Sequence, residues 1–202
     1  MAEGIKIEIF RMKNAEELTL ALADPDSRIE TGTGAALTAA ISAAFLCRAA
    51  AETAKETQKE RVEYIVRNAE ILRKYMVHLM DEDVKARSPL KRARSEGDER
   101  KIEAAMQPAV AICGEIINMM GQSLELAKEL CAFCPKAAMH HLGESAELAM
   151  AAIRSARFFI VDMADKSSDD TYRFVIRREN EITLEQCTAL AAAVIDAAEA
   201  AV

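Results

Sequence analysis

The chain has 202 residues, of which 51% are hydrophobic and 4% aromatic, and it contains seven Gly, four Pro and no Trp. This length supports one sizeable core, and a core of Ala, Leu, Ile, Val and Met suits closely packed helices rather than a sheet. The formal net charge of −7 argues against a nucleic-acid-binding protein, because such binding neutralises phosphates with an excess of Lys and Arg.

Neither export nor membrane insertion is expected. Residues 1–10 carry three charged side chains and lack the apolar core of a secretory signal. The Ala-rich stretch 35–51 is interrupted by Arg48, and we expect it to be too short and too weakly apolar to span a membrane. Five scattered cysteines without an export signal predict free thiols in a cytoplasmic protein.

The first part of the chain predicts two helices. A short helix over 14–23 ends at Asp24-Pro25. A Gly/Thr turn over 30–35 then leads into a long Ala-rich helix over 35–55. Small residues occur on several faces of this helix, which indicates a central position with neighbours on more than one side.

A third helix is predicted over 59–86. Two rows of apolar residues spaced by seven form one seam along it: Val62, Ala69 and Met76, and Ile65, Leu72 and Leu79. We expect this helix to end at Ser88-Pro89, because a residue before proline avoids helical backbone. The charged segment 90–100 is expected to be a mobile surface loop.

The second half of the chain predicts further helices over 99–130, with a kink or break at Pro108, and over 143–164. A short helix over 168–175 and a last helix from residue 183 follow.

No internal repeat or linker divides the chain, so residues 1–202 are expected to form a single all-α domain, an antiparallel bundle of long helices. Seams this apolar often bury a face against a second copy, and we expect a homodimer.

The apolar row through Met76, continued by seven residues, reaches Asp83. Asp81 and Glu82 lie off this row and are expected to face water. Asp83 is therefore expected to face the interior or a cleft, where desolvation suits a carboxylate to proton transfer near neutral pH. A structural role is the alternative, since Asp83 and Arg87 are spaced for an i,i+4 ion pair and charges at helix ends are usually solvated.

The Gly32-Thr33-Gly34 turn is a second candidate, as a substrate-binding element. Glycines before a helix let backbone N–H groups approach a ligand, and a helix N-terminus favours an anion. Such a turn also serves simply to reverse the chain, and this alternative stays open.

Cys131, Cys134, His140 and His141 lie within eleven residues and are residue types that bind zinc. Their spacing matches no strong zinc pattern, so no metal site is predicted. The two cysteines also fit as small apolar residues at a helix end. The sequence contains no P-loop, complete GxGxxG, HExxH or GxSxG motif.

The order of these segments resembles the cyclodeaminase domain of the formiminotetrahydrofolate cyclodeaminase and methenyltetrahydrofolate cyclohydrolase family. Glu30-Thr31-Gly32-Thr33-Gly34-Ala35-Ala36 before an Ala-rich helix is similar to the family's Pro-Gly-Gly-Gly-Ser turn. Leu79-Met80-Asp81-Glu82-Asp83-Val84-Lys85-Ala86 resembles its Asp-x-Asp-x-x-Ala element. Ala156–Phe159 and Ser168–Tyr172 follow in family order, so the resemblance covers nearly the whole chain.

The resemblance implies an all-α homodimer that acts on a folate. The family converts 5-formiminotetrahydrofolate to 5,10-methenyltetrahydrofolate with loss of ammonia, and relatives hydrolyse the methenyl compound to 10-formyltetrahydrofolate. The second Asp of the Asp-x-Asp element, Asp83 here, is then the acid/base residue. Gly32, Thr33 and Gly34 would lie against the folate. The resemblance implies no cofactor besides the tetrahydrofolate derivative that serves as substrate.

The chain departs from the family pattern where the resemblance places the ligand. Thr31 and Thr33 replace the family's Pro and middle Gly, and Arg87 replaces the Phe after the Asp-x-Asp element. A changed substrate or a lost activity would produce such changes. Two alternatives therefore stand beside the folate enzyme. One is a homodimer that keeps the fold and binds a small molecule without chemistry, and the other is a related enzyme in which His140 and His141 supply acid/base groups.

Overall fold

The structure, a computed structural model, describes residues 12–27 and 29–201. In chain order its helices are α1 (Ala15–Ala23), α2 (Thr31–Glu56), α3 (Glu60–Glu96), α4 (Glu99–Leu130), the short 3₁₀ helix η2 (Lys136–Ala138), α5 (Met139–Lys166) and α6 (Asp170–Glu199). These described residues contain no strand, which confirms the predicted all-α class. The expected lack of a secretory signal concerns residues 1–10, which lie outside the described part of the chain.

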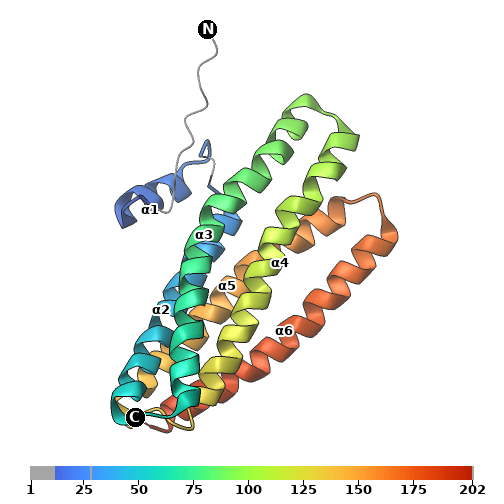
Figure 1. The fold of residues 1–202 in the computed structure, drawn as a ribbon. Helices are drawn as coiled ribbons and strands as arrows, with labels where there is room; N and C mark the ends of the chain where they lie inside the picture. The colour runs from blue at the N-terminus through green and yellow to red at the C-terminus, as the bar shows by residue number, and fades with distance from the viewer. Residues whose placement is uncertain (1–11, 28, 202) are drawn as a thin grey trace.

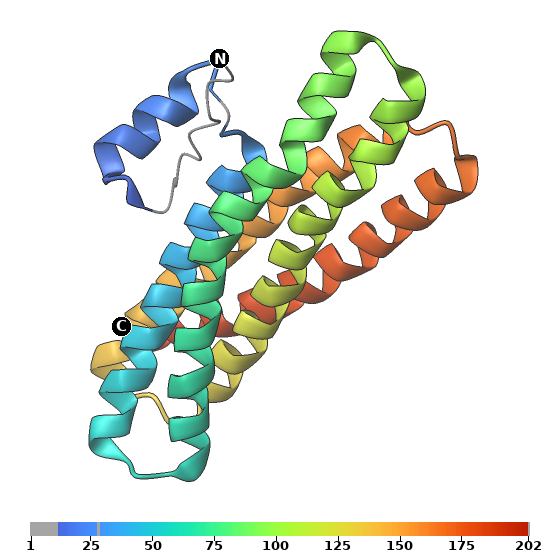
Figure 2. The same cartoon turned by 45° about the horizontal axis from the view of Figure 1, so that its top comes forward.

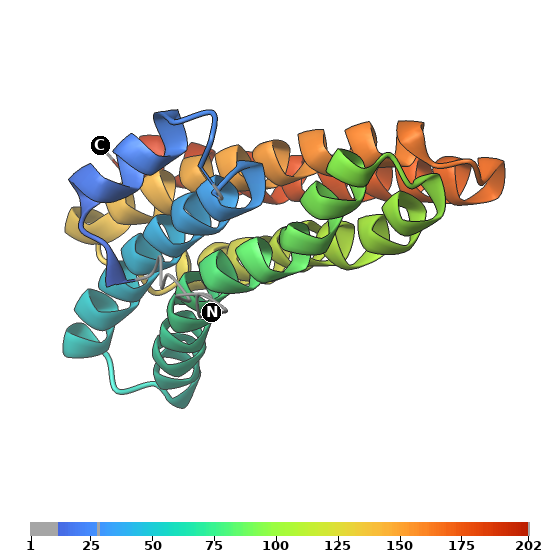
Figure 3. The same cartoon turned by 90° about the horizontal axis from the view of Figure 1, so that it is seen from above.

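Helices α2 to α5 form an antiparallel four-helix bundle, and α6 lies along α4 and α5 (Figure 1). Short connections join the long helices, so consecutive helices run in opposite directions. Seen from above, the α5–α6 pair and the α3–α4 pair lie in separate layers (Figure 3). Helix α1 lies outside the bundle, near the N-terminal end of α2 (Figure 2). At that end the candidate residues of α2 and α3 meet.

Helix α2 is the central helix, as its small residues predicted. Ala36, Ala39, Ala43 and Ala49 are fully buried, and the helix packs against α3 on one side and α5 on the other. Alanine allows neighbouring helix backbones to approach closely. Because the helices are close, the hydroxyl of Ser42 donates to the backbone carbonyl of Ser145 in α5 at 2.8 Å.

The length of α2 overturns one expectation. Its 26 residues contain a window with a mean hydropathy of 1.5, so α2 is long and apolar enough to cross a membrane. The segment 35–51 was expected to be too short and too weakly apolar, but the helix extends beyond it at both ends. Half of the apolar window is buried inside the bundle, and the core helix of a soluble protein has the same length and composition.

Helix α3 continues through Pro89, so the predicted helix end there and the predicted loop over 90–100 are wrong. Proline removes one N–H from the helical hydrogen-bond ladder. Leu90 and Ala93 nevertheless continue the buried side of the helix, each with an exposed fraction of 3%, and this packing outweighs the missing bond. The helix ends at Gly97, whose φ of 69° is left-handed.

Three other predicted boundaries also differ. Helix α2 begins at Thr31, so the predicted Gly/Thr turn is its first helical turn. Helix α4 runs through Pro108 without a break. The two helices predicted over 168–175 and from residue 183 form the single helix α6. Its middle is rich in Arg and Glu, which are good helix formers even where they bury nothing.

Replacing Pro89 with Ala is expected to raise the free energy of unfolding by about 1–3 kcal/mol, because the new N–H completes the hydrogen-bond ladder of α3. Chemical denaturation followed by circular dichroism measures this change. Ser88→Ala alters the same exposed turn without adding a backbone bond, and it should shift the free energy by less than about 0.5 kcal/mol. A loss of stability in Pro89→Ala would show that the packing of α3 depends on the proline.

Candidate functional site

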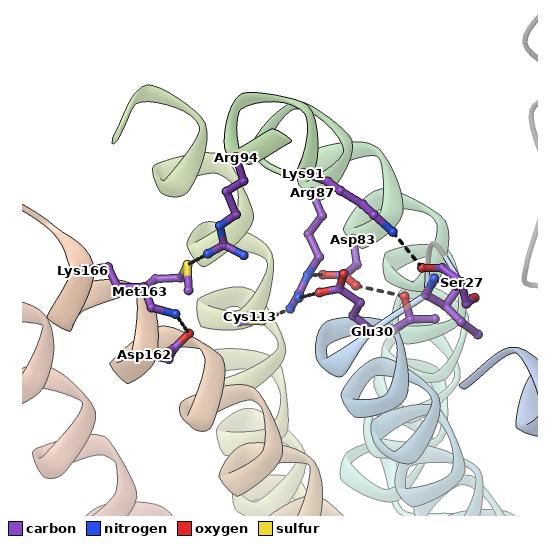
Figure 4. Close-up of polar contacts among 12 residues, drawn as sticks. Ser27, Glu30, Asp83, Arg87, Lys91, Arg94, Cys113, Asp162, Met163 and Lys166 are labelled. Atoms are coloured by element: carbon purple, nitrogen blue, oxygen red, sulfur yellow. Dashed lines mark hydrogen bonds and ion pairs between the residues drawn. The ribbon is translucent and has the colours of Figure 1, made fainter. Parts of the chain in front are cut away.

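Asp83 faces the interior of the bundle, as the continued apolar row predicted. Its exposed fraction is 0%, and each of its carboxylate oxygens accepts a hydrogen bond. The Thr33 hydroxyl donates to Oδ2 at 2.9 Å. Arg87 Nε donates to Oδ1 at 2.7 Å (Figure 4). The i,i+4 ion pair is therefore present, and it is buried rather than solvated.

The two neighbouring acids differ from each other. Glu82 is partly exposed and pairs with Lys85 on the surface at 2.7 Å. Asp81 was expected to face water, but only 8% of it is exposed, so that expectation is wrong. Helix α3 lies between α2 and α4, and its buried arc is therefore wider than the two apolar rows seen in the sequence.

Gly32 explains how the first turn of α2 approaches Asp83 so closely. A Cβ atom at position 32 would overlap Oδ1 and Cγ of the Asp83 carboxylate. Only glycine fits at this position, and the neighbouring Thr33 then donates its hydroxyl to the same carboxylate across a sequence separation of 50 residues. The structure thus brings together two segments that the sequence identified separately.

Arg87 links Asp83 to the surface. Its side chain is 6% exposed, and its second donor, Nη1, lies 2.9 Å from Oε2 of Glu30, whose side chain is 46% exposed. The guanidinium carbon lies 3.6 Å from the centre of the Phe159 ring of α5. Burial opposes the charge of Arg87, but Asp83 and Glu30 contribute to raising the pKa of the guanidinium above its ordinary value. It therefore remains a cation that orients both carboxylates.

Cys113 of α4 is another neighbour of Arg87, with its Sγ 3.8 Å from Nη2. Burial raises the pKa of the Cys113 thiol to about 12, although the positive charge of Arg87 opposes this shift. The sulfur is thus a neutral thiol near neutral pH. A nucleophilic role for it is not supported, because the thiolate is the reactive form.

A cleft of about 650 Å³ opens beside this network, between the α1–α2 connection, the start of α2 and α5. Its lining includes the apolar Leu22 and Leu37, and also Glu30, Gly34 and Ser155. This volume is comparable to that of small-molecule sites, but the cleft is broadly open to solvent. Of the three predicted binding residues, Gly34 lines the cleft, whereas Gly32 and Thr33 contact Asp83 instead. Asp83 is not part of the lining.

The Cys/His group lies at the opposite end of α2. His141 is buried between two carboxylates, at 3.7 Å from Glu52 and 3.2 Å from Glu144, while His140 is exposed beside it. Burial raises the pKa of the Cys131 and Cys134 thiols. Within residues 12–27 and 29–201, no three His, Cys, Asp or Glu side chains are arranged to hold a metal ion.

Sequence reasoning singled out neither Glu30 nor Ser155. Glu30 directly precedes the Gly/Thr segment, but nothing in its local pattern shows that an arginine 57 residues further on binds it. Ser155 carries no local signal, because its place in the cleft depends on how α5 packs against α2.

Comparisons with known proteins agree with the resemblance. The family profile described as formiminotransferase-cyclodeaminase matches residues 14–181. A search of curated proteins found no match. Among solved structures, the crystal structure of formiminotetrahydrofolate cyclodeaminase from Thermotoga maritima superposes with a TM-score of 0.86 at 20% sequence identity, over 94% of this chain and 97% of that chain. At this identity the superposition shows a shared fold.

Gly32→Ala is expected to lower the free energy of unfolding by about 2 kcal/mol or more, because the new Cβ displaces the Asp83 carboxylate from its two partners. Gly34→Ala is the matched control: its Cβ would lie 3.5 Å from Leu22, an ordinary contact, and replacing a helical glycine should be neutral or stabilising by up to about 1 kcal/mol. Chemical denaturation of both variants measures the difference. Equal effects would contradict the close approach of Gly32 to Asp83.

Proposed function

Since the chain belongs to the formiminotransferase-cyclodeaminase family, we propose that it acts on a reduced folate that carries a one-carbon unit. The reaction is either the cyclisation of 5-formiminotetrahydrofolate to 5,10-methenyltetrahydrofolate with release of ammonia, or the hydrolysis of 5,10-methenyltetrahydrofolate to 10-formyltetrahydrofolate. The family match over residues 14–181 and the shared fold support this proposal.

The observation that carries the proposal is the enclosure of Asp83 by the start of α2, next to a cleft of suitable size. Both reactions need a group that accepts and returns a proton. In the cyclisation, the formimino group reacts in its protonated form (–CH=NH2+): N10 loses a proton when it bonds to the formimino carbon, and the departing NH2 group gains one as it leaves as ammonia, so the positive charge stays on the methenyl product. A carboxylate performs both transfers. It also stabilises the positive charge that the product shares between N5 and N10.

The remaining parts of the proposal concern cofactor and location. The chemistry needs no cofactor besides the folate, since it moves protons and no electrons. All five cysteines are free, and we propose a cytoplasmic location, where thiols stay reduced. We propose no nucleic-acid or membrane partner.

The alternative is a family member that binds its ligand without turning it over. It rests on the Asp83–Arg87 pair, because Asp83 is fully buried and both of its oxygens already have partners. For Asp83 to exchange a proton with a ligand in the cleft, the first turn of α2, which lies between them, must shift.

Asp83→Asn is expected to lower the rate of the catalysed reaction by about 100-fold or more, because an amide does not shuttle protons. The absorbance of 5,10-methenyltetrahydrofolate is the readout: it appears when 5-formiminotetrahydrofolate is cyclised and disappears on hydrolysis, so the two substrates distinguish the two reactions. Ammonia release gives an independent measurement of the cyclisation.

Glu82→Gln is the matched control, since it removes a carboxylate from the adjacent surface position, and it should keep the wild-type rate. Thermal unfolding of both variants checks that they fold. If the wild-type chain binds reduced folates but converts neither substrate, the alternative of binding without chemistry is correct. If it does not bind them, the folate proposal itself fails.

We also propose that the chain is a homodimer through the outer face of α2 and α5. Ile41 and Phe158 are 44% and 72% exposed, and each lies one turn from a residue that lines the cleft. Light scattering after size exclusion should give the mass of two chains for the wild type. The double variant Ile41→Asp/Phe158→Asp should give the mass of one chain. Phe174→Asp on α6, where Phe174 is also 72% exposed, is the control. A monomeric wild-type chain would contradict this proposal.

A further inference from the structure

The cleft contains a carboxylate to which the family resemblance assigns no role. Glu30 lies in the lining, and its side chain is 46% exposed. One of its oxygens, Oε2, accepts a hydrogen bond from Arg87 at 2.9 Å. Within residues 12–27 and 29–201, the structure describes no partner for the other oxygen, Oε1. Each carboxylate oxygen has two lone pairs, so Glu30 retains several acceptor positions for a ligand.

The orientation of Glu30 is set from the interior. Arg87 is held by Asp83 at 2.7 Å and stacks on the Phe159 ring at 3.6 Å. It therefore binds Glu30 as a fixed support rather than as a mobile surface side chain. The formal charges of Asp83, Arg87 and Glu30 leave one negative charge, and Glu30 presents it to the cleft. A preorganised acceptor of this kind binds a donor at little entropic cost.

The second acid of the cleft is less suited to bind a ligand. Asp24 also lies in the lining, but its Oδ1 accepts the backbone N–H of Asp26 at 2.9 Å within the α1–α2 connection. Among residues 12–27 and 29–201, the structure describes no ion pair between Asp24 and an arginine. The rest of the lining combines apolar side chains such as Leu22 and Leu37 with hydroxyl groups such as Ser155. This surface suits a flat ring that has polar atoms at one edge.

We propose that Glu30 binds the N–H edge of the pterin ring of the substrate, and that Arg87 and Asp83 position it for this contact. The inference rests on the proposed folate function. A pterin carries its 2-amino group and N3–H side by side, so a carboxylate accepts from both, much as it does from a guanidinium. The contact places the pterin ring in the cleft.

The test compares the affinities of full-length wild type, Glu30→Gln and Asp24→Asn, measured by calorimetric titration. The probes are 5-formyltetrahydrofolate, a tetrahydropterin without the aminobenzoyl-glutamate part, and p-aminobenzoyl-glutamate without the pterin. Glu30→Gln keeps an oxygen that can accept from Arg87, so it should fold, and thermal unfolding verifies this. A second variant, Glu30→Asp, keeps the charge and withdraws the carboxylate by one methylene group.

We expect Glu30→Gln to weaken binding of the folate and of the tetrahydropterin by about tenfold or more, because a charge-assisted hydrogen bond is lost. Glu30→Asp should weaken both to a smaller extent. Binding of p-aminobenzoyl-glutamate to Glu30→Gln, and of all three probes to Asp24→Asn, should stay within about twofold of wild type.

If the wild type binds the folate and Glu30→Gln binds it equally well, this inference is overturned while the folate function stands. Equal losses in Glu30→Gln and Asp24→Asn would also overturn it, because general acidity of the cleft would then explain the effect. If the wild type binds neither the folate nor the tetrahydropterin, both the inference and the proposed function fail.

Discussion

The buried ion pair between Asp83 and Arg87 is the interaction on which the functional end of this molecule depends. Removing two charges from water costs several kcal/mol per ion, and their attraction offsets this only when the remaining hydrogen-bonding groups are also satisfied. The structure meets that requirement with Thr33 from α2, Glu30 from the α1–α2 connection and the Phe159 ring from α5. The pair therefore holds several separate segments in one arrangement.

This requirement connects two of the departures from the family pattern, Thr33 and Arg87. A carboxylate at position 83 and a guanidinium at position 87 need a close partner on α2, and Gly32 allows the backbone to approach while Thr33 supplies the hydroxyl. Thr33 at the start of α2 and Arg87 after the Asp-x-Asp element thus contact the same carboxylate. The site therefore has two parts. The buried part lies on helices α2 and α3, and the exposed carboxylate of Glu30 lies on the α1–α2 connection.

Much of the fold was predictable because it depends on local periodicity. The small residues of α2 predicted its central position, and the seven-residue spacing through Met76 predicted that Asp83 faces the interior. The continuation of α3 past Pro89 was not predictable in this way. The local preference of Pro89 and the residue before it against helical backbone was outweighed by the burial of Leu90 and Ala93. This burial is a tertiary effect.

The candidate site was predictable only in part, for the same reason. Asp83 and the Gly32–Gly34 segment follow from spacing and turn chemistry, and the two do meet. The burial of Asp81 depends on α3 being flanked by two helices. The position of Glu30 depends on a contact with Arg87 across a separation of 57 residues. Sequence patterns on one helix carry no information about such contacts.

A double-mutant cycle across the ion pair tests this account most directly, with Asp83→Asn, Arg87→Met and the double variant compared by their free energies of unfolding. Each single change should cost about 3–5 kcal/mol, because it leaves one buried charge without its partner, whereas the double variant should lose much less than the sum of the two. Additive losses would contradict the account, since they would mean that Asp83 and Arg87 stabilise the molecule independently of each other.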